Sequence, residues 1–274
     1  MTEVREAPLE VKSYGILKPD SGDEYVIVIE NSPRRVRVAF NGETVADSTR
    51  MKMMHETRHL PIYYFPAEDV GAEFLRRTDH TSHCPHKGDA SYWSVTVVGR
   101  TAKNAVWAYE DPIDSVPGLR GLMAFYWGKM DHWYEEDEEI FIHPRDPYKR
   151  IDTMPPSRLV QVRLGGEIVA DTRRASFLFE TGMPTRYYIP REDVRADLLS
   201  PSPLRTGCPY KGTASYDSVT VGGKTFENIV WFYPDPIAEC PKIKDLLCFF
   251  NEKVEAILVD GEEIPKVPSP WSDD

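Results

Sequence analysis

Two lysines stand in the same short motif at separate places in the chain. Lys87 and Lys211 each follow Cys-Pro-x and precede a glycine. Because proline fixes φ and glycine allows a positive φ, this motif predicts a stiff loop that holds its lysine in one place. A lysine held in this way suits an anionic group on a ligand, and the alternative is a surface lysine on a tight connection.

Two glutamates are the matching acidic candidates. Glu56 and Glu180 each end an apolar segment that predicts a β-strand. A carboxylate that is partly buried there needs a partner or a raised pKa, and either suits an acid or base in a pocket. In the alternative, the alternation of side chains along the strand turns both glutamates to water. We expect the pocket position.

Tyrosine and tryptophan side chains also recur at matching places. Trp107 and Tyr109 are two residues apart, which puts both on one face of a strand. Aromatic side chains with polar tips line ligand pockets, although they also fill the edge of a core and satisfy their own hydroxyl groups. We predict one ligand site in each half of the chain, formed by Glu56, Tyr64, Lys87, Tyr92 and Trp107 in the first and by Glu180, Tyr188, Lys211, Tyr216 and Trp231 in the second.

The cysteines offer a second chemistry. Cys84 and Cys208 open the lysine motif, and a thiolate at either position is a candidate nucleophile. Histidines flank Cys84 at His83 and His86, whereas the second half of the chain has no histidine, so the two halves cannot share a histidine-assisted mechanism. The four cysteines include no CxxC pair, and we predict buried or loop thiols without a metal site or disulfide.

The elements that position these residues occur twice. When Gly42 is placed over Gly166 and the offset of 124 is kept to Phe125 over Phe249, 39 of the 84 positions are identical and no gap is needed. Repeats of this length predict two domains, which we place at residues 1–143 and 144–274. Duplicated units often pack as two copies of the single unit would, so we expect a pseudo-twofold pair, either as a monomeric pseudo-dimer or as a homodimer.

Within each copy the elements are short and mainly β. Val36, Val38 and Phe40 alternate before Asn41-Gly42, which predicts a strand, a type I′ turn and a second strand. Further segments rich in aromatic and β-branched residues bring the expectation to six or seven strands in each domain. One short helix of one or two turns is expected in each copy, over residues 68–75 and 192–199, with its acidic residues near the start.

The ends of the matched block are less regular. Residues 24–29 and 139–143 predict edge strands, and the proline-bounded, charged segment Pro144–Arg150 predicts the linker. A strand so close to the linker either pairs within its own domain or crosses over to the other domain.

Charge and hydropathy exclude several classes of protein. The chain has 33 Lys and Arg against 44 Asp and Glu, a net charge of -11, which repels nucleic acid and anionic membrane surfaces on average. The first thirty residues show no signal peptide and no apolar run long enough to span a membrane. We expect a cytoplasmic protein that binds neither nucleic acid nor membrane.

Several motifs together resemble a known family. The patterns NGE-VADS, YY-P-EDV, CP-KG-ASYWSV and N-VW-Y-DPI are similar to those of the bacterial and fungal family called domain of unknown function 427, or DUF427, here in tandem. The resemblance implies two tandem β-tent-like domains, in which a pocket forms between two sheets, and the family is sometimes labelled a nucleotidyltransferase. Relatives of the fold hold zinc through paired CxxC motifs that this chain lacks, so neither zinc nor another cofactor is expected.

The sequence leaves three functions open. In the first, the protein binds an unknown small molecule in an aromatic-lined Lys/Glu pocket in each repeat. In the second, it is an enzyme that uses Glu/Lys acid–base or cysteine chemistry in the same pocket. In the third, it is a protein-interaction scaffold with a duplicated apolar surface.

Overall fold

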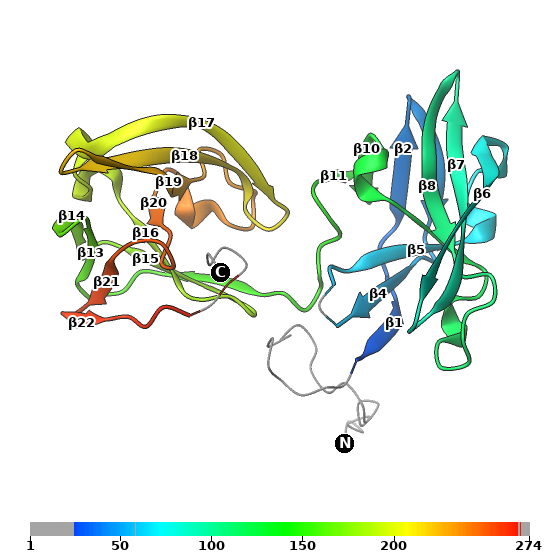
Figure 1. The fold of residues 1–274 in the computed structure, drawn as a ribbon, viewed down its shortest axis with the longest axis horizontal. Helices are drawn as coiled ribbons and strands as arrows, with labels where there is room; N and C mark the ends of the chain where they lie inside the picture. Colours follow the sequence, from blue (N-terminus) through cyan, green and yellow to red (C-terminus); the bar gives the residue numbers. More distant parts are fainter. Residues whose placement is uncertain (1–24, 58, 268, 270–274) are drawn as a thin grey trace. The chain divides into compact units, whose positions relative to one another are not determined.

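The computed structural model describes residues 25–57, 59–267 and 269, and these residues are mainly β. They divide into two compact units between Arg145 and Asp146, so each domain is described by itself (Figure 1). Each domain has eleven strands among the described residues, more than the six or seven expected. Three-residue 3-10 helices stand in place of the single short helix expected in each domain: Ala67–Asp69, Ala72–Phe74, Pro117–Leu119 and Trp127–Lys129 in the first, and Arg191–Asp193, Ala196–Leu198 and Pro241–Ile243 in the second.

The first domain contains one large and one small antiparallel sheet. The large sheet has the order β1 (Ile27–Asn31), β4 (Lys52–Glu56), β5 (Ile62–Pro66), β9 (Leu122–Phe125), β8 (Arg100–Ala108), β7 (Gly88–Val97) and β6 (Leu75–Cys84). The small sheet has the order β11 (Glu138–Ile140), β10 (His132–Glu135), β2 (Val36–Phe40) and β3 (Glu43–Ser48). The turn between β2 and β3 has positive φ at Asn41 (51°) and Gly42 (85°), as the type I′ turn requires.

The second domain repeats this arrangement. Its large sheet has the order β12 (Ile151–Met154), β15 (Ser176–Glu180), β16 (Arg186–Ile189), β20 (Leu247–Phe249), β19 (Lys224–Phe232), β18 (Gly212–Val221) and β17 (Leu199–Cys208). Its small sheet has the order β14 (Glu167–Thr172), β13 (Val160–Leu164), β21 (Ala256–Val259) and β22 (Glu262–Glu263). The offset of 124 residues holds from β1 and β12 to β11 and β22, so the structural repeat is longer than the block matched by sequence.

The strands beside the linker stay in their own domains. Strand β11 pairs with β10, and β12 pairs with β15, so the alternative in which a strand crosses over is wrong. Strand β1 pairs with β4 as the edge of the first large sheet, although residue 24 of the expected edge strand lies outside the described residues. The segment 144–150 contains no strand, which agrees with its interpretation as a linker.

Each large sheet has apolar residues on both of its faces. One face packs against the small sheet, where the buried side chains of β2, such as Val36 and Val38, meet Phe65 and Phe125 of the large sheet. The other face carries a second buried cluster, which the segment 110–121 helps to cover through Leu119. In the second domain Ile243 is the corresponding covering residue. This second cluster positions the site described below.

Within the part of the chain that the structure describes, no helix has the length and apolar character needed to cross a bilayer.

Candidate functional site

The structure brings Glu56 and Lys87 of the first domain together. The Lys87 ammonium donates a hydrogen bond to Glu56 Oε1, and the two side chains are only 8% and 2% exposed, respectively. Glu56 ends β4, and Lys87 lies in the turn between β6 and β7. The expectation that these two residues share one position in the fold therefore agrees with the structure.

The loop around each lysine is fixed by its backbone. The Lys87 N–H donates to the Cys84 carbonyl at 3.2 Å, and the Lys87 carbonyl accepts from the Ile113 N–H at 3.1 Å. The next residue, Gly88, has a φ of +100°, a conformation that L side chains rarely adopt. Lys211 has the same two backbone bonds, and both lysines are buried, so the alternative of a surface lysine on this loop is wrong.

A third residue that the sequence analysis missed completes the site in the first domain. The Tyr25 hydroxyl donates to Glu56 Oε1, and its ring stacks on His86 with 3.6 Å between centroids and 10° between planes. Tyr25 lies two residues before β1 begins and 31 residues before Glu56. The pair in the first domain therefore carries a neutral phenol over its carboxylate.

The second domain repeats the pair and changes the third residue. The Lys211 ammonium donates to Glu180 Oε2 at 2.5 Å, and Lys149 Nζ lies 3.1 Å from Glu180 Oε1. Lys149 occupies the position of Tyr25, since the two are 124 residues apart. Its ammonium also lies 5.4 Å from the ring centroid of Tyr210, which replaces His86. Two ammonium groups therefore face one carboxylate in the second domain.

Both carboxylates are held in their charged form. Burial alone would raise the pKa of Glu56, but the hydrogen bonds from Lys87 and Tyr25 outweigh it and bring that pKa below its usual value. The same balance lowers the pKa of Glu180, where Lys211 and Lys149 act against burial. Burial lowers the pKa of Lys211, but Glu180 more than compensates, so this lysine remains an ammonium. The arrangement can therefore offer fixed charges to a ligand.

The predicted aromatic residues lie in the second cluster of each domain. Tyr64 is fully buried, and its hydroxyl accepts a hydrogen bond from Trp107 Nε1 at 3.2 Å; Tyr188 and Trp231 repeat this contact at 3.2 Å. Tyr92 and Tyr216 are buried as well, and their hydroxyl groups pair with Ser82 and Thr206, each at 2.7 Å. These hydroxyl groups are satisfied within the protein, so the aromatic residues form the packed support of the site.

A tyrosine outside the predicted set connects this cluster to the lysine. The Lys87 ammonium lies 5.9 Å from the ring centroid of Tyr109, which is buried in the cluster. Burial raises the pKa of Tyr109 well above its ordinary value, so its hydroxyl stays protonated. The i, i+2 spacing with Trp107 was the sequence signal that could have added this residue to the set.

The cysteines are free thiols. Cys84 and Cys208 are half-buried beside the lysine loops, and Cys240 and Cys248 are buried. Burial raises the pKa of Cys240 above its ordinary value and that of Cys248 to about 12, which keeps both protonated. Among residues 25–57, 59–267 and 269, no group of three or more His, Cys, Asp or Glu side chains is placed to hold a metal ion.

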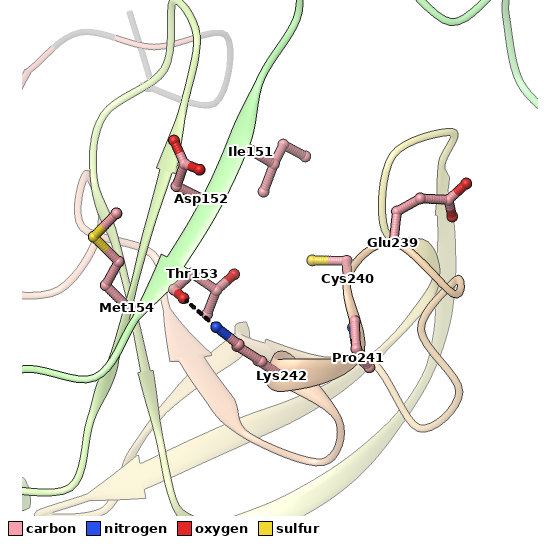
Figure 2. Close-up of a pocket in the computed structure, with 8 residues that line it drawn as sticks. All are labelled: Ile151, Asp152, Thr153, Met154, Glu239, Cys240, Pro241 and Lys242. Atoms are coloured by element: carbon pink, nitrogen blue, oxygen red, sulfur yellow. Dashed lines mark hydrogen bonds between the residues drawn. The ribbon is translucent and has the colours of Figure 1, made fainter.

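A hollow of about 290 Å³ lies beside β12 in the second domain (Figure 2). It separates β12 from the segment that leads into the 3-10 helix Pro241–Ile243. Ile151 lines it and is the residue directly opposite Glu180 across β12 and β15, so their side chains share one face of the sheet. The residues that line the hollow are Ile151, Asp152, Thr153, Met154, Glu239, Cys240, Pro241 and Lys242.

The comparison with known families agrees with the repeated geometry. The chain matches twice the family described as a domain of unknown function, DUF427, at residues 28–136 and again at residues 152–260. No curated protein matches the chain. The two matched ranges cover most of both large sheets and both small sheets, so the chain belongs to the DUF427 family, whose domain it contains twice in tandem.

Proposed function

We propose that the protein binds a small molecule with a polar end, and that the Lys–Glu pair of each domain is the anchor for that end. The observation that carries this proposal is the repetition of the same buried pair on equivalent loops and strands of both domains. The aromatic cluster beside each pair supports it by holding the lysine loop and the glutamate strand in place.

Stability alone is a weak reason for such a pair. Removing two charges from water costs free energy, and a buried ion pair can often be replaced by apolar residues without loss of stability. The two copies differ at 45 of the 84 aligned positions (84 minus the 39 identical ones), and the third partner of the pair changes from Tyr25 to Lys149. That Glu56 and Lys87 recur as Glu180 and Lys211 among altered neighbours favours a role in recognition.

Binding is favoured over acid–base catalysis by the charge state of the pair. A general acid or base works best when its pKa lies near the operating pH. The pKa values of Glu56 and Glu180 are lowered and that of Lys211 is raised. The interactions within the site therefore move all three pKa values further from pH 7. Fixed charges of this kind suit recognition of a ligand group better than transfer of a proton.

A thermal-shift screen of small carboxylates, phosphates and amino acids tests the proposal. A ligand present at about 100 times its Kd stabilises the folded state by about 2.7 kcal/mol. The apolar double variants E56L/K87M and E180L/K211M should stay folded, because each removes both members of the buried pair and the Lys149 side chain that then loses Glu180 is partly exposed. They should lose the shift at the altered domain. The matched control R195M/E167L removes an exposed ion pair instead and should keep the shift. An unchanged shift in both double variants, or no shift with any compound, would contradict the proposal.

A further inference from the structure

Several of the residues that line the hollow in the second domain are replaced by different residues at the equivalent positions of the first domain. In the second domain Thr153, Cys240 and Lys242 line it. At the equivalent positions of the first domain, 124 residues earlier, stand Ile29, Val116 and Gly118. Ile29 Cδ1 comes within 3.5 Å of the place where a Cβ atom on Gly118 would lie, and both Ile29 and Val116 pack against the second cluster. An isoleucine side chain therefore occupies the space beside Gly118 in the first domain.

The second domain leaves an open slot at this place. Figure 2 shows the Cys240 thiol directed toward β12, with Ile151 and Thr153 on the facing wall. The Lys242 ammonium crosses the lower end of the slot and donates to the Thr153 carbonyl at 3.2 Å. The lining therefore combines the apolar side chain of Ile151 and the thiol of Cys240 with the hydroxyl of Thr153, and one end carries an ammonium whose remaining N–H groups can donate to a ligand.

The charges around the slot favour an anion. Glu180, which lies opposite Ile151 of the slot, pairs with both Lys149 and Lys211, and this group therefore has one excess positive charge. Of the two acidic residues that line the slot, Asp152 is held by the Arg150 guanidinium through bonds of 2.7 and 3.0 Å. The carboxylate of the other, Glu239, points away from Cys240 and β12. The ammonium of Lys242 is therefore the charged group presented at the slot.

We propose that this slot binds a small monocarboxylate with a short apolar body, and that the second domain alone has such a site. The carboxylate accepts hydrogen bonds from Lys242, and the apolar body lies between Ile151 and Cys240. A volume near 290 Å³ is at the lower end of the range for ligand pockets, which restricts the site to a small molecule. The inference rests on the proposed function, because Ile151 of the slot lies directly opposite Glu180 of the anchor.

Calorimetric titration of the full chain with hexanoate, and with hexanamide as its neutral counterpart, tests this inference. We expect one hexanoate per chain with a Kd below roughly 1 mM. The variant T153I places in the slot the side chain found in the first domain, and it should weaken binding of hexanoate about tenfold or more. T220I is the matched control, since it makes the same change at an exposed position of β18, and it should leave binding unchanged. Equal binding by T153I and wild type, or no saturable binding of hexanoate, overturns the inference.

A second variant tests the charge. K242M should weaken hexanoate about tenfold but change hexanamide little, because only the carboxylate gains a charge-assisted hydrogen bond from the ammonium. Equal losses for both compounds would overturn the assignment of Lys242 as the carboxylate partner. Thermal denaturation of each variant without ligand checks that the fold is retained.

The same titration separates this inference from the proposed function. If T153I binds hexanoate as wild type does while E180L/K211M does not, the slot is wrong and the Lys–Glu anchor stands. If T153I loses binding and E180L/K211M keeps it, the slot stands and the Lys211–Glu180 pair takes no part in holding this ligand, which contradicts the proposed function for the second domain. If neither variant changes binding, both are wrong.

Discussion

The two domains hold one buried pair in two different ways. In the first, the Glu56 carboxylate is shared by Lys87 and the neutral Tyr25. In the second, two ammonium groups, those of Lys211 and Lys149, face the carboxylate of Glu180. Because the strands match one for one, the difference lies in the side chain just before β1 and β12 and not in the fold. A fixed sheet can therefore hold the anchor constant while one neighbouring residue sets the charge of the site.

The largest expected difference in stability between the two domains comes from replacing the lysine of the buried pair. K87M leaves Glu56 buried with only a phenol as partner, and loss of one member of a buried pair costs about 3–5 kcal/mol. K211M leaves Glu180 with Lys149, so we expect a smaller loss of about 1–2 kcal/mol. Amide hydrogen exchange, followed on peptides from each domain, gives the free energy of opening separately for the two.

The double variant E56L/K87M is the control for this prediction. It removes both charges, so the first domain should recover most of the stability that K87M loses. Equal losses for K87M and K211M would show that Lys149 does not support Glu180 and that the two sites are electrostatically alike.

A second buried ion pair also distinguishes the two domains, because it occurs in the second domain and not at the matching residues of the first. Arg186 and Glu252 form two bonds of 2.8 and 2.7 Å, and their side chains are 5% and 3% exposed. Ile62 and Gly128 stand at these positions in the first domain. R186I should destabilise the second domain by about 3 kcal/mol, at the lower end of the usual range, because Glu252 keeps the hydroxyl of Ser269 as a partner.

Hydrogen exchange again provides the measurement for R186I. Protection in the second domain should fall, and protection in the first domain should be unchanged. The variant R195M, which removes the exposed guanidinium that pairs with Glu167 and Asp197, is the control and should change protection by less than about 1 kcal/mol. A loss with R186I no larger than that of R195M would show that the buried pair contributes no more than a surface one.

The pH dependence should have the same sign in both domains. The folded-state pKa values of Glu56 and Glu180 are lowered, so each pair contributes its full stability above the unfolded pKa of about 4.3 and loses it as the pH falls through the lower folded value. A tenfold difference between the acid dissociation constants of the folded and unfolded states corresponds to about 1.4 kcal/mol of stability. Because two ammonium groups act on Glu180, we expect its contribution to persist to lower pH than that of Glu56.

The pH prediction is checked by hydrogen exchange of wild type and of the two apolar double variants between about pH 3 and pH 7. The free-energy difference between wild type and each variant should be flat above about pH 5 and change in favour of the variant as the pH falls further. A difference that moves in favour of wild type on acidification would mean that the folded protein raises the pKa of its glutamates.

The sequence predicted the repeat and the meeting of lysine and glutamate for a physical reason. An ungapped match of 84 positions fixes the lengths of strands and turns in both copies, and Cys-Pro-x-Lys-Gly specifies its own loop. The contact of Tyr25 with Glu56 spans 31 residues and depends on the pairing of β1 with β4, which no local pattern reveals. Had the offset of 124 been extended beyond the matched block, it would have set Lys149 against Tyr25.

The strand count and the slot were harder to predict. Strands as short as β9 and β20, with four and three residues, are too brief to show an alternating pattern. All residues of both are buried, so alternation is absent even within them. The slot is open because Thr153 has a smaller side chain than Ile29, the residue at the same position of the first domain. Each of the two residues faces a segment nearly 90 residues later in the chain, and the sequence alone does not show that these segments meet.

The smallest expected effect comes from exchanging the residues that distinguish the two sites. K149Y gives the second domain the phenol of the first, and Y25K gives the first domain an ammonium. Because the Lys149 side chain is 24% exposed, each exchange should change stability by less than about 1 kcal/mol. The charge should nevertheless be visible as a salt effect, since ions screen a partly exposed ammonium. Hydrogen exchange at low and high salt should show weaker salt dependence in the second domain of K149Y and stronger dependence in the first domain of Y25K. If both variants keep the salt dependence of wild type, residue 149 does not set the charge of its site, and the two domains differ in shape alone.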